Sequence, residues 1–250
     1  MTLPALAAQL IVFSQQVQLE PQMDAVLAAV HAAGFTAIEC GSNQFADDPQ
    51  AFITMLKKHN LRVSALHGGI PGNPGEVIRL MELYQTRDFC ISGVGGWEGK
   101  VAAKYASDTQ EVNRVGLELA RYGYKTHYHN HAYEFDKLDN SKTGMDVILE
   151  NLDPAAADLC VDVAWVHIGG QDPASFLRAN KARTSYVHLK DYTGNRHWVE
   201  LGQGVVPLAS VVALLPELQV RWVVYEQDTS DNPAGQSCAA SYAYLQGLGF

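Results

Sequence analysis

Residues 158–191, DLCVDVAWVHIGGQDPASFLRANKARTSYVHLKD, contain two β-rich runs on either side of a segment with helical spacing. The β-rich runs are Asp158–Trp165 and Ser185–Asp191, and apolar residues recur at helical intervals over Ala174–Asn180 between them. A strand, a helix and a second strand at this spacing indicate parallel strands, because parallel neighbours need a long crossover connection.

The same alternation of β-rich and helical segments extends over the whole chain. The predicted strands are Gln9–Phe13, Ala37–Gly41, Arg62–His67, Asp88–Val94, Lys125–His131, Asp158–Trp165, Ser185–Asp191 and Arg221–Asp228. The predicted helices are Met23–Ala33, Ala51–Lys58, Val77–Tyr84, Thr109–Tyr122, Met145–Asn151, Ala174–Asn180, Leu208–Leu215 and Ala239–Leu248. Eight such units favour a closed (β/α)8 TIM barrel over an open doubly wound sheet, and a length of 250 residues suits one barrel.

No linker and no break in composition divides the chain, so residues 1–250 are predicted to form one TIM-barrel domain. Hydrophobic residues make up 47% of the chain, enough for a sizeable core. We interpret the cysteines as buried reduced thiols of a cytoplasmic protein, because they lie far apart and form no CxxC pair. They are Cys40, Cys90, Cys160 and Cys238.

Several classes of function are disfavoured by the same sequence. The net charge of −9 opposes binding to nucleic acid, whose phosphates repel an acidic chain. The N-terminus lacks the basic region of a signal peptide, and no run approaches the roughly 18 apolar residues of a membrane helix. The glycine cluster at residues 93–99 fails the dinucleotide and P-loop patterns, which disfavours cofactor-dependent redox chemistry.

Polar residues interrupt the last four predicted strands near their carboxyl ends. Because side chains alternate between the two faces of a strand, Asp162, His188 and Glu226 share a face with Cys160, Lys190 and Asp228 respectively, while the opposite faces carry apolar residues such as Val161, Val187 and Val223. The apolar faces suit packing against helices, so the polar faces are predicted to point into the barrel at its catalytic mouth.

Burying several carboxylates and imidazoles together costs several kcal/mol unless a cation neutralises them. Asp162, His188 and Glu226, with Glu134 or His129 from the fifth strand, predict a site for one divalent ion such as Mn²⁺, Zn²⁺, Mg²⁺ or Co²⁺. The absence of thiolate from this set argues against a structural zinc site.

Five segments together resemble the xylose-isomerase-like TIM-barrel superfamily of sugar phosphate isomerases and epimerases. They are YHNHAYEF (128–135), CVDVAWVHIGGQDPASFL (160–177), YVHLKDY (186–192), LGQGVVPL (201–208) and VVYEQD (223–228). The first is similar to a YHNHxxEF motif within that superfamily. The resemblance covers most of the chain and is strongest from Lys125 onward.

The resemblance implies a metal held by Glu, Asp, His and Glu from the fifth to the eighth strand. Asp162, His188 and Glu226 match three of these ligands. Many relatives end the fifth strand in Glu-Asn-His, and His129 stands at the aligned position here. We expect Glu134 to reach back as the fourth ligand, with His129 as the alternative.

The implied chemistry is metal-assisted isomerisation or epimerisation of a small carbohydrate through an enolate. Glu134 and Glu226 are the expected pair that exchanges the proton on opposite faces of the substrate. The same enolate followed by loss of a leaving group gives a lyase or dehydratase acting on an inosose or a 3-keto-glycoside. In that variant His129, His131 and Lys190 serve as acid or base.

Other polar and aromatic residues are candidates for substrate binding. Glu39 and His67 end the second and third predicted strands, where a structural ion pair is an equally good interpretation. Trp97 and Trp165 suit stacking on a sugar ring or packing in the core. Arg196 would suit an anionic substrate, but few basic residues lie near the predicted mouth, which favours a neutral sugar, polyol or glycoside.

Two further readings share the fold. A non-catalytic sugar-binding barrel would bind its ligand without turnover. An AP-endonuclease-like DNA repair enzyme would need a larger metal cluster, and the acidic charge opposes it. Aromatic residues near the C-terminus, Tyr242, Tyr244 and Phe250, are compatible with a homo-oligomer.

Overall fold

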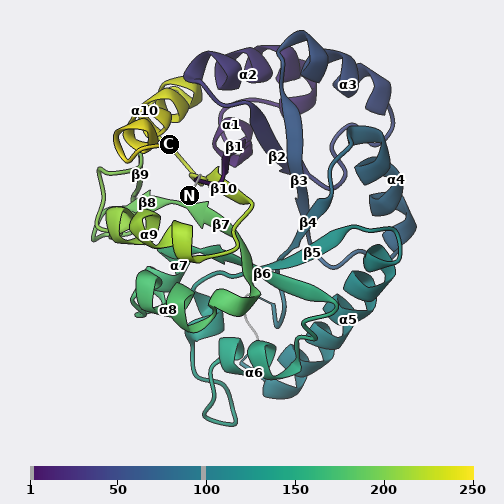
Figure 1. Ribbon diagram of the computed structural model, residues 1–250, viewed down its shortest axis with the longest axis vertical. Coiled ribbons are helices and arrows are strands. Elements are labelled where there is room, and N and C mark those ends of the chain that lie inside the picture. Colours follow the sequence, from purple (N-terminus) through teal and green to yellow (C-terminus); the bar gives the residue numbers. More distant parts are fainter. Residues whose placement is uncertain (1–2, 97–99) are drawn as a thin grey trace.

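A computed structural model describes residues 3–96 and 100–250 of the chain. Within them, eight parallel strands close into a barrel in the order β1-β10-β7-β6-β5-β4-β3-β2, which confirms the predicted TIM barrel (Figure 1). The strands are β1 (Ala5–Gln9), β2 (Ala37–Gly41), β3 (Arg62–Gly68), β4 (Asp88–Ile91), β5 (Lys125–His129), β6 (Ala157–Asp162), β7 (Thr184–Leu189) and β10 (Trp222–Tyr225).

Helices surround the barrel as an outer ring (Figure 1). The ring contains α2 (Leu19–Ala33), α3 (Pro49–Lys58), α4 (Pro74–Tyr84), α5 (Ala102–Ala120), α6 (Gly144–Asn151), α8 (Pro173–Ala179), α9 (Leu208–Leu214) and α10 (Ala234–Gly247). Asp48, Asn73 and Asp172 cap the first turns of α3, α4 and α8, each followed by a proline at the first helical position.

Short elements decorate the strand ends. They are α1 (Ile11–Ser14), α7 (Val163–Ile168), η1 (Tyr133–Phe135), η2 (Lys181–Arg183), η3 (Leu215–Glu217) and the antiparallel pair β8 (Asp191–Tyr192) and β9 (Trp198–Val199). The β8–β9 hairpin and the turns after β5 and β6 lie beside the carboxyl ends of the strands, where they border the mouth of the barrel.

The predicted first strand, Gln9–Phe13, is wrong. The strand is Ala5–Gln9, and the chain turns into α1 directly after it. Ala5 and Ala7 face the barrel interior, where Tyr186 and Trp222 fill much of the space, so the segment has little of the β-branched and aromatic character by which strands are recognised. The predicted sixth strand also ends earlier, because the Asp162 side chain accepts the backbone N–H groups of Ala164 and Trp165 and so starts α7.

A small apolar layer fills the middle of the barrel. It consists of Ala7, Ala37, Ala65, Cys90, Cys160, Tyr186, Trp222 and Val224. Tyr186 is fully buried and donates its hydroxyl to Ser64, so its large ring occupies space that the surrounding alanines leave. The outward faces of the strands belong to a second, larger core beneath the helices.

Below this layer, at the amino ends of the strands, lies a network that we call the basal network. Its members are Asp88, Lys125, His127, Asp158, Ser185 and Arg221. Asp88 contacts His127 Nε2 at 2.9 Å and Arg221 at 3.3 Å, and Ser185 donates to Asp158 at 2.8 Å. Lys125 pairs with Asp158 at 3.2 Å, so each carboxylate of the network has a cationic partner.

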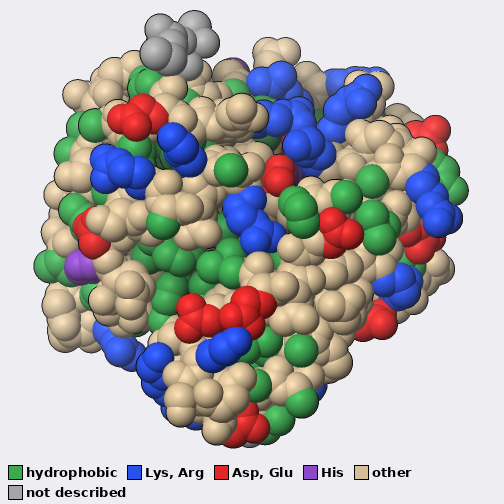
Figure 2. Space-filling view, turned by 60° about the horizontal axis from the view of Figure 1, so that its bottom comes forward, with side chains coloured by type: hydrophobic (Ala, Val, Ile, Leu, Met, Phe, Trp, Pro, Cys, Tyr) green, Lys and Arg blue, Asp and Glu red, His purple; other side chains and the backbone are tan. Residues whose placement is uncertain are grey.

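The surface shows no dominant charge on the face in Figure 2, where acidic and basic side chains are both present. Hydrophobic side chains line a hollow near the centre of that view (Figure 2). Within residues 3–96 and 100–250, no helix has the length and apolar character needed to cross a membrane.

Candidate active site

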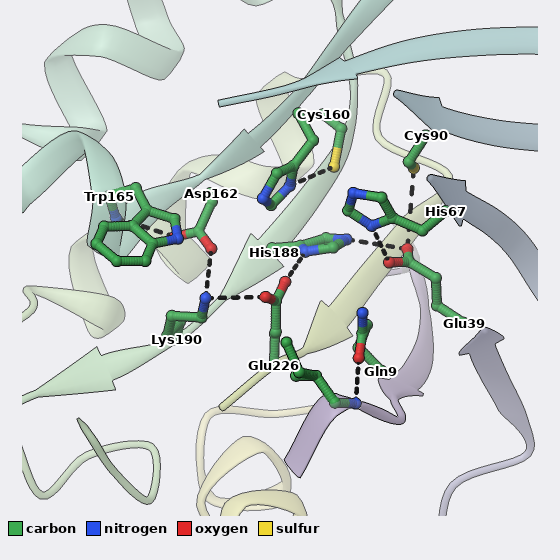
Figure 3. A network of polar contacts seen from close by, with 12 residues as sticks. Gln9, Glu39, His67, Cys90, Cys160, Asp162, Trp165, His188, Lys190 and Glu226 are labelled. Atoms are coloured by element: carbon green, nitrogen blue, oxygen red, sulfur yellow. Dashed lines mark hydrogen bonds and ion pairs between the residues drawn. The ribbon is translucent and has the colours of Figure 1, made fainter. Parts of the chain in front are cut away.

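Four predicted or alternative metal ligands meet at the carboxyl ends of the strands. His129 and Asp162 are the last residues of β5 and β6, His188 lies near the end of β7, and Glu226 directly follows β10. Their ligand atoms all lie within 4.8 Å of one another, and all four residues are buried. We call these four residues, together with Glu39, Lys190 and Asp228, the mouth cluster. Figure 3 labels five of its members, Glu39, Asp162, His188, Lys190 and Glu226.

Glu39 orients the imidazole of His188. Its Oε2 lies 2.9 Å from His188 Nε2, and its Oε1 lies 2.7 Å from His67 Nδ1. With Nε2 turned to Glu39, the other ring nitrogen of His188 faces the Glu226 carboxylate (Figure 3). Burial raises the pKa of Glu39, but the charges and hydrogen bonds of His188 and His67 outweigh it and lower that pKa to about 2. Glu39 therefore acts as a carboxylate behind the histidine, an arrangement common around metal ligands.

Lys190 brings a cation into the mouth cluster. Its Nζ lies 2.8 Å from both Glu226 Oε1 and Asp228 Oδ1 and 3.4 Å from Asp162 Oδ2. The rings of Trp165 and Trp198 each lie 4.9 Å from the ammonium. Burial lowers the pKa of Lys190, but the surrounding carboxylates outweigh it and raise the pKa above its ordinary value, so the side chain is charged.

The mouth cluster has more acidic groups than this lysine can balance. Three of its four carboxylates, Asp162, Glu226 and Asp228, share Lys190, the one Lys or Arg that they contact among the described residues, and the fourth, Glu39, pairs with His67 and His188. Asp162 Oδ2 is buried and has no hydrogen-bond partner in that part of the chain. Burial raises the pKa of Asp162 to about 7, although the Lys190 ammonium lowers it.

These observations fit a divalent cation. Two imidazoles and two carboxylates form a mixed nitrogen and oxygen set suited to Mn²⁺, Zn²⁺ or Co²⁺. Asp162 Oδ2 has no hydrogen bond within the described residues and shares Lys190 with two other carboxylates, so a bound cation would complete the charge balance. His129, Asp162, His188 and Glu226 would hold it.

Glu134, the expected fourth ligand, is not among these four residues. It lies in η1, where its Oε1 accepts the Tyr128 hydroxyl at 2.7 Å and its Oε2 accepts the backbone N–H of His131 at 2.9 Å. The tight turn directs the carboxylate back at its own strand, while His129, the alternative, points to the barrel axis. Burial raises the pKa of Glu134 to about 7, against the lowering effect of these hydrogen bonds.

A cavity of about 380 Å³ adjoins the mouth cluster. It is lined by His131, Ala132, Tyr133, Asp136, Trp165, Ile168, Gly169, Gly170 and Arg196. His131 links the two spaces, because its ring lies 5.0 Å from that of His129 and 5.7 Å from that of Trp165. Burial, helped by Lys190, lowers the pKa of His131 to about 3, which leaves a neutral imidazole. The indole Nε1 of Trp165 is buried without a hydrogen-bond partner within the described residues.

The other candidates for substrate binding have different surroundings. Glu39 and His67 pair with each other, as the structural interpretation expected, and Glu39 also contacts His188. Arg196 is exposed in the β8–β9 turn at the rim of the cavity. Trp97 lies outside the described residues.

Some features of the site were not identified from sequence. Asp228 forms an ion pair with Lys190 in the mouth cluster. The alternation of side chains along the strand, which puts Asp228 on the same face as Glu226, could have identified it. Trp198 had no local signal, because the β8–β9 hairpin alone brings it within 4.8 Å of Trp165. Asp191 accepts the backbone N–H groups of Gly202 and Gly204 at 3.0 Å, and so holds the following loop beside Lys190.

Comparisons with known proteins agree with the barrel fold. A family model for the xylose isomerase-like TIM barrel matches residues 27–246. Among curated proteins, none matches the chain. A sugar phosphate isomerase/epimerase from Parabacteroides distasonis has a similar structure, with a TM-score of 0.84 and 19% identity over 98% of this chain and 94% of that one.

Two further solved structures are similar over nearly their whole lengths. D-allulose 3-epimerase from Methylomonas sp., in complex with D-allulose, has a TM-score of 0.76 and 15% identity over 99% of this chain and 98% of that one. The 3-keto-D-glucoside 4-epimerase from E. coli has a TM-score of 0.71 and 16% identity over 98% and 99%. At identities of 15% and 16%, these two likenesses show a shared fold. Because the family model matches most of this chain, the chain belongs to the xylose isomerase-like TIM barrel family.

Proposed function

We propose that this chain is a divalent-metal-dependent isomerase or epimerase that acts on a small carbohydrate by enolate-type proton transfer. The observation that carries the proposal is the convergence of His129, Asp162, His188 and Glu226 within 4.8 Å at the mouth of the barrel. A divalent cation, when bound, supplies polarisation of a substrate carbonyl and neighbouring hydroxyl, which acidifies the C–H bond between them.

Proton transfer requires groups on two sides of the substrate. We assign proton donation to an oxygen to Lys190, whose ammonium already donates to Glu226 and Asp228 at 2.8 Å. We assign proton acceptance to the neutral imidazole of His131, which lies between His129 and the cavity. Glu134 holds the backbone of His131, and we assign it a positioning role.

The cavity beside the cluster supports a carbohydrate as substrate. Its volume of about 380 Å³ lies within the range of small-molecule sites. The rings of His131, Tyr133 and Trp165 offer apolar faces for a sugar ring, and Trp165 Nε1 offers an unused donor. Arg196 is the one Lys or Arg among the described lining residues, which favours a neutral sugar, polyol or glycoside.

A second candidate is a lyase or dehydratase acting on an inosose or a 3-keto-glycoside. The cavity favours it, because none of its described lining residues belongs to the mouth cluster, so it offers a space beside the cluster for a departing group. In this reaction the neutral His131 imidazole takes the C–H proton and the C–H electrons form the enolate. The enolate electrons then form the new C=C bond as the bond to the β-oxygen breaks, and the Lys190 N–H gives its proton to the leaving oxygen.

The experiment is to incubate metal-loaded protein with ketoses, inososes and 3-keto-glycosides in heavy water and follow the products by NMR. An epimerase incorporates deuterium at the carbon beside the carbonyl, whereas a lyase releases the leaving group. Tight binding of one of these compounds without exchange or release would support a non-catalytic sugar-binding barrel instead. His188→Ala is the control, and turnover unchanged in that variant would contradict the proposal.

A further inference from the structure

A second group of ligand-type residues lies beneath the mouth cluster. The ligand atoms of Cys90 on β4, Cys160 on β6 and His188 on β7 lie within 4.8 Å of one another, and all three residues are buried. Cys160 precedes Asp162 by two residues on the same strand, so its side chain faces the same interior one step nearer the amino end. Figure 3 shows both sulfur atoms on the side of the His188 ring away from Lys190.

The distances around these thiols suit a tetrahedral site. Cys160 Sγ lies 3.7 Å from His129 Nδ1, and Cys90 Sγ lies 3.8 Å from Glu39 Oε2. A tetrahedral site with metal–sulfur bonds of about 2.3 Å and metal–nitrogen or metal–oxygen bonds of about 2.0 Å has edges of about 3.6 Å between sulfur and nitrogen or oxygen. Either His129 or Glu39 is therefore within reach as a fourth ligand.

The two thiols differ from the other cysteines of the chain. Cys90 and Cys160 belong to the small layer inside the barrel, whereas Cys40 and Cys238 belong to the outer core between strands and helices. A disulfide does not suit the inner pair, because β5 separates β4 from β6 and two strand spacings amount to about 9 Å, beyond what a disulfide bridges. The inner pair is thus a dithiol with a histidine beside it.

We propose that Cys90, Cys160 and His188 form a second metal position, for a thiophilic divalent cation such as Zn²⁺ or Cd²⁺. Binding there releases the two thiol protons to solvent, and the two thiolates neutralise the cation. His188 belongs to both groups, so occupation of the thiol site excludes a cation from the mouth cluster. The exclusion rests on the proposed function, whereas the thiol site itself does not.

The test is a Cd²⁺ titration of the full-length, metal-free protein, followed by the sulfur-to-cadmium charge-transfer absorption in the ultraviolet. We expect one Cd²⁺ per chain with this band in the wild type, and loss of the band in Cys90→Ser and Cys160→Ser. The matched controls Cys40→Ser and Cys238→Ser should keep it. No band in the wild type, or a band that survives in both inner variants, would overturn the proposal.

Circular dichroism of each variant shows whether it has folded, and Cys90→Ser decides the question if Cys160→Ser does not fold. Asp162→Asn removes a mouth ligand but no thiol-site ligand, so it should keep the cadmium band. Mn²⁺ affinity of Cd²⁺-loaded wild type should fall at least tenfold, and simultaneous binding of both ions would overturn the exclusion. Absence of Mn²⁺ binding with an intact cadmium band would contradict the proposed function and leave the thiol site standing.

Discussion

Two buried polar networks occupy opposite ends of the same barrel, and they differ in how completely their charges are paired. In the basal network, two carboxylates, Asp88 and Asp158, contact two cations, Arg221 and Lys125. In the mouth cluster, three carboxylates, Asp162, Glu226 and Asp228, share Lys190, the one Lys or Arg that they contact among the described residues, while Glu39 pairs with His67 and His188. The apolar layer around Tyr186 separates the two networks.

The difference indicates different purposes. A buried carboxylate with full partners adds order to the fold at little net cost, whereas unpaired buried charge lowers stability by several kcal/mol. This loss of stability falls on the mouth cluster, which lies at the end of the barrel where TIM-barrel enzymes hold their active sites. We infer that the basal network serves stability and that the mouth cluster is completed by a ligand.

The largest effect is expected from Glu226→Gln, which removes a metal ligand and the main partner of Lys190. Turnover on an identified substrate should fall about 10³-fold, equivalent to about 4 kcal/mol, because positioning of the cation and of the proton donor is lost together. The measurement is steady-state kinetics with Mn²⁺ titration. Full turnover and intact metal binding in this variant would show that Glu226 has neither role.

Asp88→Ala should have the next largest effect, on stability and not on metal binding. It leaves His127 and Arg221 without their buried carboxylate, which should lower the free energy of unfolding by about 3 to 4 kcal/mol. Chemical denaturation measures the change, and Asp24→Ala is the control, since that aspartate forms an exposed ion pair with Lys58. If both variants lowered the free energy of unfolding equally, the basal network would contribute no more to stability than an exposed ion pair.

Glu134 sharpens the comparison, because it is a buried carboxylate held by neutral donors. Burial raises its pKa from 4.5 to about 7 in the folded chain. The folded state therefore binds the Glu134 proton more tightly than the unfolded state does. Protonation of Glu134 stabilises the fold fully below about pH 4.5, and this stabilisation is lost as the pH rises through about 7. The free energy of unfolding should fall by as much as about 3 kcal/mol over this range. Glu134→Gln does not titrate and should lack this loss.

Denaturation of wild type and Glu134→Gln at about pH 5 and about pH 8 gives the difference directly. If the two proteins lose stability in parallel over this range, hydrogen bonds from Tyr128 and His131 hold the carboxylate ionised and the assigned protonation is wrong.

Glu39→Gln should have the smallest of these effects. The amide still occupies the space behind His188 but no longer offers a charged acceptor to its Nε2. Mn²⁺ affinity is expected to fall by about 10- to 100-fold, or about 1.4 to 2.7 kcal/mol. Isothermal titration calorimetry measures it, and an unchanged affinity would reduce Glu39 to a structural partner of His67.

The barrel and three of the four residues that converge at its mouth were predictable from sequence, because both depend on local periodicity. Asp162, His188 and Glu226 follow from strands in which one face is polar and the other apolar. The choice between Glu134 and His129 was not predictable, since it depends on the tight turn η1, which spacing alone does not reveal. The strand Ala5–Gln9 was misplaced because small residues that fit a barrel interior give a weak signal. Trp198 reaches the site only through the β8–β9 hairpin.

The central claim, that the mouth cluster and not the basal network binds a divalent cation, is tested most directly by Mn²⁺ titration of three proteins. They are wild type, Asp162→Asn and the matched basal variant Asp158→Asn. We predict one Mn²⁺ per chain in wild type and Asp158→Asn, and affinity at least about 100-fold weaker in Asp162→Asn, whose amide still caps α7. No binding by the wild type, or equal binding by all three proteins, would contradict the account.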